Sequence, residues 1–151
     1  MAQRLVASKH MKLKPTKTAG ANAGVLLPKL LENYFKAGRK AAEGKPSPKK
    51  LHGFRLATKQ FRYSLELFRP LYGAGLDRKL GALSELQSVL GKMSDYHSVR
   101  TLLAGDKALE AKLDRAAKKK LKEFHTQWAA FDSGGQLRRW RAYLEKGGAL
   151  G

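Results

Sequence analysis

The chain of 151 residues contains no cysteine. This absence excludes disulfide bonds, thiol catalysis and cysteine-ligated zinc sites. Isoleucine is also absent, and no stretch alternates apolar and polar residues at a period of two, so the sequence offers no candidate β-strand. No apolar run approaches the ~20 residues that a transmembrane helix requires, and we therefore expect no membrane span.

Acidic residues are scarce. Twelve Asp and Glu stand against 31 Lys and Arg, which gives a formal net charge of +19. Such an excess attracts polyanions, so the candidate partners are nucleic acid, an anionic membrane surface and phosphate-containing ligands. The first acidic residue is Glu32. We predict a flexible basic arm over residues 1–21, a helical domain over 22–146 and a short tail over 147–151.

Signatures of catalysis are missing. The sequence has no nucleophile elbow, no phosphate-binding loop ending in Gly-Lys-Ser/Thr and no glycine-rich dinucleotide turn, and Ser84 and Ser88 are expected to be ordinary helix residues. No two of the four histidines share a spacing that suits metal ligands; they are His10, His52, His97 and His125. We predict a protein that is not an enzyme and that holds no cofactor and no metal.

Apolar residues recur at helical spacing along most of the chain. The pattern predicts helices over 25–42 (capped by Asn22), 48–71, 76–90 (stopped by Gly91), a short segment from Ser94 or Asp95 to Leu103, 107–131, and a last helix that buries Leu137, Trp140 and Leu144. Short loops join these segments. The predicted fold class is an all-α antiparallel helical bundle that resembles a four-helix bundle.

The segment 49–68 carries two parallel rows of side chains. A largely apolar row recurs at spacings of three and four and consists of Leu51, Phe54, Thr58, Phe61, Leu65 and Phe68. A basic stripe consists of His52, Arg55, Lys59 and Arg62. One residue is about 100° of helical turn, so this basic stripe lies beside the apolar row. Because cations on one face oppose the helix unless an anion offsets their repulsion, we predict that the basic stripe binds a polyanion.

The same segment resembles the CHAD domain, a histidine-bearing α-helical family associated with inorganic polyphosphate. The family motif His-x-x-Arg-x-x-x-Lys-x-x-Arg-Tyr-x-x-Glu-Leu-Phe corresponds to His52, Arg55, Lys59, Arg62, Tyr63, Glu66, Leu67 and Phe68. A second motif, Leu-Gln-x-x-Leu-Gly-x-x-x-Asp, is similar to residues 86–95. The likeness extends over about residues 24–146. Gln60 and Ser94 depart from the pattern, since a basic residue is common at the first position and Asn or Arg at the second.

The resemblance implies binding of inorganic polyphosphate without catalysis, for granule targeting or regulation of phosphate polymers. It assigns phosphate contacts to His52, Arg55, Lys59 and Arg62, and we extend the site to Lys49, Arg138 and Arg141. Asp95 is expected to hold a basic residue or cap a helix and not to contact the ligand. Family members are about twice as long, with two bundles facing each other across a basic pore, so this half-length chain is expected to form a homodimer.

An alternative remains open from the residues alone. The basic arm and a lysine-rich helix over 107–131 would suit a helical protein that binds nucleic acid without reading its sequence. No helix-turn-helix or RNA-binding signature supports this alternative. The expected location is the cytoplasm, in association with polyphosphate granules.

Overall fold

The computed structural model describes residues 18–149 of the chain. Its elements are α1 (Ala19–Ala41), α2 (Pro48–Leu67), a short 3₁₀ turn η2 (Arg69–Leu71), α3 (Ala74–Leu102), α4 (Lys107–Phe131) and α5 (Gln136–Ala149). The described residues contain no strand, so the predicted all-α class is confirmed. None of the helices between residues 18 and 149 has the length and apolar character needed to cross a membrane.

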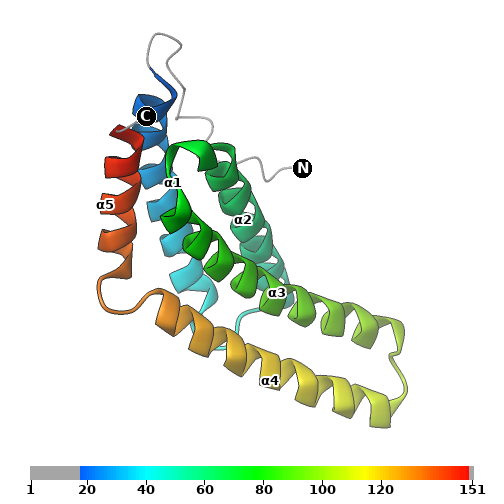
Figure 1. The fold of residues 1–151 in the computed structure, drawn as a ribbon. Helices are drawn as coiled ribbons and strands as arrows, with labels where there is room; N and C mark the ends of the chain where they lie inside the picture. Colours follow the sequence, from blue (N-terminus) through cyan, green and yellow to red (C-terminus); the bar gives the residue numbers. More distant parts are fainter. Residues whose placement is uncertain (1–17, 150–151) are drawn as a thin grey trace.

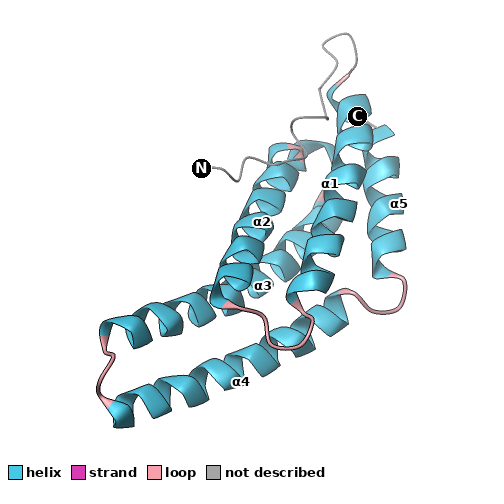
Figure 2. Ribbon diagram, turned by 180° about the vertical axis from the view of Figure 1, so that it is seen from behind, coloured by secondary structure: helices cyan, strands magenta, loops and turns pink. Residues whose placement is uncertain are grey.

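The helices form an L-shaped assembly (Figure 1). α1, α2 and α5 run side by side, with α1 packed most extensively on α5, and α3 packs on both α2 and α4. The second half of α3 and the first half of α4 form a hairpin that extends beyond the other helices, as Figure 2 shows from behind. This arrangement leaves α2 and α3 in contact, and Arg55 and Arg62 of the basic stripe lie between them.

Aromatic side chains from four helices fill the centre of the core. Tyr34 of α1 stacks on Phe54 and Phe61 of α2, with ring centroids 5.1 and 4.9 Å apart. Trp128 of α4 meets Phe54 edge-on at 5.5 Å, and Trp140 of α5 lies 6.0 Å from Phe61. The apolar row predicted on α2 is buried except at Leu51, which is partly buried. Its burial fixes the rotation of α2, and with it the direction of the basic stripe.

Two helix starts follow ordinary capping chemistry. Ser47 accepts a hydrogen bond from the Lys50 amide at 3.1 Å, and Pro48 occupies the first turn of α2 as predicted. At α1 the prediction was wrong. The helix begins at Ala19, and the cap is Thr18, which accepts from the Ala21 amide at 3.1 Å, while Asn22 lies inside the helix.

The prediction that Gly91 ends a helix is also wrong. α3 continues without a break from Ala74 to Leu102, so Ser94 and Asp95 lie within it and cap nothing. Glycines that stand outside helices here, such as Gly73 and Gly105, have positive φ values of 74° and 107°, whereas Gly91 keeps a negative φ. A helical glycine costs only about 1 kcal/mol, which packing of the long hairpin offsets.

The predicted domain boundaries at residues 21/22 and 146/147 both fall inside helices of the structure. α1 starts within the predicted arm, and α5 extends to Ala149, into the predicted tail. The rest of the arm, residues 1–17, and residues 150–151 lie outside the described part of the chain. Near Pro70, α2 stops at Leu67 and not at Leu71; the chain then makes the 3₁₀ turn, because proline cannot donate the next helical hydrogen bond.

Candidate polyanion-binding site

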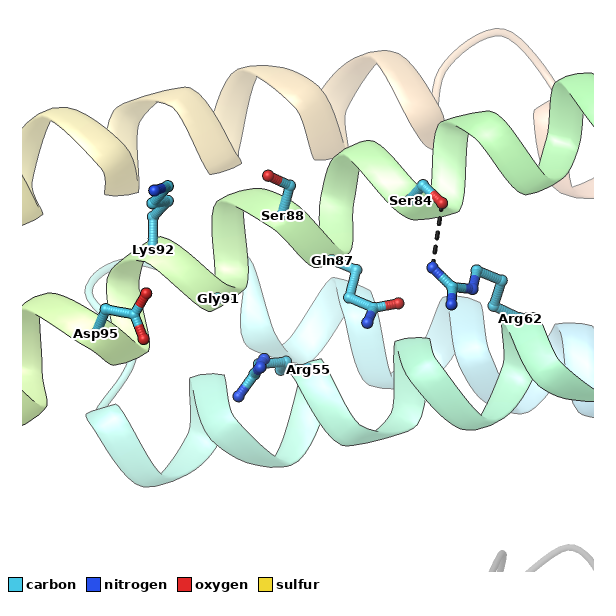
Figure 3. Close-up of a pocket in the computed structure, with 8 residues that line it drawn as sticks. All are labelled: Arg55, Arg62, Ser84, Gln87, Ser88, Gly91, Lys92 and Asp95. Carbon is cyan, nitrogen blue, oxygen red and sulfur yellow. Dashed lines mark hydrogen bonds between the residues drawn. The ribbon is translucent and has the colours of Figure 1, made fainter.

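A pocket of about 320 Å³ lies between α2 and α3. α2 contributes Arg55 and Arg62, and α3 contributes Ser84, Gln87, Ser88, Gly91, Lys92 and Asp95 (Figure 3). Arg55 and Arg62 are seven residues apart, which is close to two full helical turns, so they lie on one face of α2. The lining thus holds three cationic side chains and one carboxylate.

Arg62 stands at one end of the pocket. Its Nη1 donates a hydrogen bond to Ser84 Oγ at 3.2 Å, and its Nε lies 3.5 Å from Glu66 Oε1. The guanidinium carbon lies 5.2 Å from the centroid of the Tyr63 ring. The Arg62 side chain is 21% exposed, so the charge is held in place yet remains accessible to a ligand.

Arg55 stands nearer the other end, against the α3 backbone. A Cβ atom built on Gly91 would lie 3.7 Å from Arg55 Nε, so the guanidinium passes close over this glycine. Arg55 Nε is buried without a hydrogen-bond partner, and Arg55 makes no ion pair with any residue from 18 to 147. Unsatisfied guanidinium groups of this kind favour an anionic ligand.

The remaining residues of the basic stripe lie outside the pocket. His52 and Lys59 are exposed on α2, displaced around the helix from Arg55, and Lys49 is exposed one turn earlier. Lys59 Nζ lies 5.8 Å from the centroid of the Tyr63 ring. These three side chains extend a basic surface along α2 from the pocket, but they do not line it.

The structure does not bring Arg138 and Arg141 to this pocket. Both lie on α5, which packs on α1, and neither is among the lining residues. Arg141 forms an ion pair with Glu32 of α1, and Arg138 is exposed. The expectation that they complete the groove is therefore not supported by their positions.

The α3 side of the pocket was missed by the sequence analysis. Ser84 and Ser88 are residues of α3 that also line the pocket, a position the sequence did not indicate, and Gln87 and Lys92 had no assigned role. Asp95 also lines the pocket, and it forms no ion pair with a described residue, contrary to the role expected for it. A signal was present in the second motif, because Gln87, Gly91 and Asp95 recur every four residues and so share one helical face.

Comparison with known protein families shows to which family the chain belongs. A family model described as the CHAD domain matches residues 2–104, more than half of the sequence. The chain belongs to the CHAD domain family. The matched range differs from the expected 24–146: it begins earlier and stops after α3, so α4 and α5 lie outside it. All residues that line the pocket lie within the matched range of residues 2–104.

No curated protein and no solved structure matches the chain. The CHAD domain assignment therefore relates the chain to a polyphosphate-associated family, while the site itself rests on the geometry between α2 and α3. Among residues 18–147 there is no group of three or more His, Cys, Asp or Glu side chains that could hold a metal ion.

Proposed function

We propose that this CHAD domain binds inorganic polyphosphate, without catalysis, in the pocket between α2 and α3. The observation that carries the proposal is that Arg55 and Arg62 of α2 line one polar pocket together with Lys92 of α3, and that the Arg55 guanidinium lacks any partner among the described residues. Guanidinium groups make paired, charge-assisted hydrogen bonds with phosphate oxygens, and a lysine adds a compact charge.

The exposed cations of α2 favour a ligand longer than the pocket. A single phosphate group would need only the pocket, whereas Lys59, His52 and Lys49 continue the positive surface along the helix. A chain of phosphates anchored at Arg55 and Arg62 would place its next groups along this surface. The lining contains one carboxylate and no histidine, which supports binding and not hydrolysis.

A competition experiment tests this function. The protein is first bound to fluorescent long-chain polyphosphate, and unlabelled polyphosphate or duplex DNA is then added at equal phosphate concentration. We expect polyphosphate to displace the probe at a much lower concentration than DNA, because a pocket of about 320 Å³ can take phosphate groups of a bare chain but is far too small for a duplex. Equal displacement by both would reject a polyphosphate site.

A second candidate, nucleic-acid binding, rests on the outer face of α4. Five cations lie within about 60° of its centre and form no ion pair with a described residue: Lys112, Arg115, Lys118, Lys119 and Lys122. The acids of α4 are occupied elsewhere, since Asp114 and Glu110 pair with Arg100 and Glu123 pairs with Lys120. Such a face suits a phosphodiester backbone.

We also infer that two copies of the chain associate. Pairing about a two-fold axis would place two α2–α3 pockets together and lengthen the basic surface offered to one phosphate chain. Light scattering with and without polyphosphate tests this inference, and a monomer under both conditions would reject it. We further propose that the protein binds polyphosphate in the cytoplasm, at polyphosphate granules.

A further inference from the structure

Asp95 is the single acidic residue in the lining of a pocket otherwise rich in cations. Figure 3 shows it on α3 at the end of the pocket where Arg55 lies, with Arg62 and Ser84 at the other end. Although Arg55 and Lys92 line the same pocket, Asp95 lies beyond 4 Å of every cationic nitrogen of the described residues. Its carboxylate is therefore available to whatever enters the pocket.

An available carboxylate is unfavourable beside bare phosphate, because the two negative charges repel each other. A divalent cation removes this conflict. Mg²⁺ is commonly held by one or two carboxylates together with the phosphate oxygens of a bound ligand, and it keeps several water molecules. One carboxylate on one side of a phosphate chain, with guanidinium groups on the other, provides this combination.

We propose that Asp95 makes the pocket select the Mg²⁺-loaded form of the phosphate chain. This inference rests on the proposed function of the same pocket. Arg55 and Arg62 contact phosphate oxygens directly. Asp95 binds a Mg²⁺ ion that is already coordinated by the phosphate chain, either directly or through a water molecule of the ion. Because the described residues hold no cluster of three metal-ligating side chains, the ion enters with the phosphate and has no site without it.

The test is calorimetric titration with long-chain polyphosphate in Mg²⁺ and in a chelator, at matched ionic strength. It compares the wild type with Asp95→Asn, which keeps the size of the side chain and removes its charge. Glu145→Gln is the matched control, because Glu145 is exposed on α5 and its loss changes the net charge equally. Circular dichroism verifies that each variant keeps its helical content.

Mg²⁺ neutralises polyphosphate and so weakens its general attraction to any basic protein. For each variant we therefore divide the affinity for polyphosphate in Mg²⁺ by the affinity in chelator, and we compare these ratios between variants. The ratio is expected to be about fivefold higher for the wild type and Glu145→Gln than for Asp95→Asn. Mg²⁺ alone is expected to give no binding heat with the wild type.

Two results would overturn the inference without rejecting the proposed function. Equal ratios in the wild type and Asp95→Asn would show that the carboxylate does not sense the ion, while the proposed polyphosphate site would stand. Heat from Mg²⁺ alone that disappears in Asp95→Asn would show a metal site independent of phosphate. Absence of polyphosphate binding under every condition would instead reject the proposed function, and the inference with it.

Discussion

Arg62 of α2 donates a hydrogen bond to the Ser84 hydroxyl of α3 across 3.2 Å, and this contact joins the two walls of the pocket. The bond connects a residue of the first CHAD motif to the helix that carries the second motif. Loss of the Ser84 hydroxyl leaves the Arg62 charge in place but removes one of its restraints. Ser84→Ala is therefore expected to weaken polyphosphate binding less than Arg62→Ala does.

Single arginine substitutions should separate the pocket from the rest of the basic surface. Arg55→Ala and Arg62→Ala are each expected to lower the affinity for polyphosphate about tenfold at low salt, because each removes a paired phosphate contact. Each should also reduce the slope of log affinity against log salt by about one. Titrations between about 50 and about 200 mM salt measure both quantities.

Arg138→Ala is the matched control for these two variants. It removes the same charge from α5, away from the pocket. We expect its effect on affinity to be well below that of either pocket arginine. A loss as large as that of Arg55→Ala would return α5 to the site and contradict the assignment to α2 and α3.

Two glycine substitutions test the packing of the core. A Cβ atom on Gly38 of α1 would overlap the Trp128 ring, so Gly38→Ala is expected to destabilise the fold by at least about 1–3 kcal/mol. Gly53 of α2 has open space at the same point, and Gly53→Ala should stabilise by about 0.5–1 kcal/mol through helix propensity. Urea unfolding gives both values. A stable Gly38→Ala variant would contradict the contact between α1 and α4.

A buried polar pair can be measured by a double-mutant cycle. The Thr58 hydroxyl donates to the Phe54 carbonyl at 2.8 Å and lies 2.9 Å from the Tyr34 hydroxyl, with Thr58 fully buried. Thr58→Val leaves the Tyr34 hydroxyl without this partner and is expected to cost about 1–3 kcal/mol. Thr58→Val combined with Tyr34→Phe should cost less than the sum of the single changes. Strict additivity would show that the pair is not coupled.

The same tyrosine predicts a dependence on alkaline pH. Burial raises the pKa of the Tyr34 phenol, and the hydrogen bond with Thr58 offsets only part of this effect. In the unfolded chain the phenol ionises near pH ~10, so above that pH the unfolded state loses a proton that the folded state keeps. Stability that is fully present below this pH therefore falls as the pH rises further. Unfolding free energies at pH ~9 and ~11 should fall less steeply for Tyr34→Phe than for the wild type.

Much of the fold could be predicted from local patterns. The helix predicted over 107–131 has the observed bounds of α4, and the helix predicted over 48–71 begins at the observed first residue of α2. In the structure Ser47 and Asp106 cap these two helices, and such caps are local features of the sequence. Gly91 was wrongly predicted to end a helix because the presence of a glycine does not report its φ. Only the packing of α3 on both α2 and α4 explains why the helix continues through this glycine.

The site was predicted on one side only. The basic stripe of α2 follows from helical spacing, but spacing does not reveal which helix faces it, so the residues of α3 were missed. The assignment of Arg141 to the site could not be corrected from sequence, because its pairing with Glu32 depends on α5 packing against α1. The motif that contains Asp95 indicates which residues of α3 share one face, but a single sequence does not show that this face contacts α2.

The most direct test of the central claim is calorimetric titration of long-chain polyphosphate into the wild type, Arg55→Ala/Arg62→Ala and Lys118→Ala/Lys122→Ala. Both double variants lose the same charge, but one alters the pocket and the other the outer face of α4. With helical content preserved, we predict that the pocket variant loses most of the affinity and that the α4 variant keeps most of it. Equal loss in both variants, or loss confined to the α4 variant, would contradict a polyphosphate site between α2 and α3.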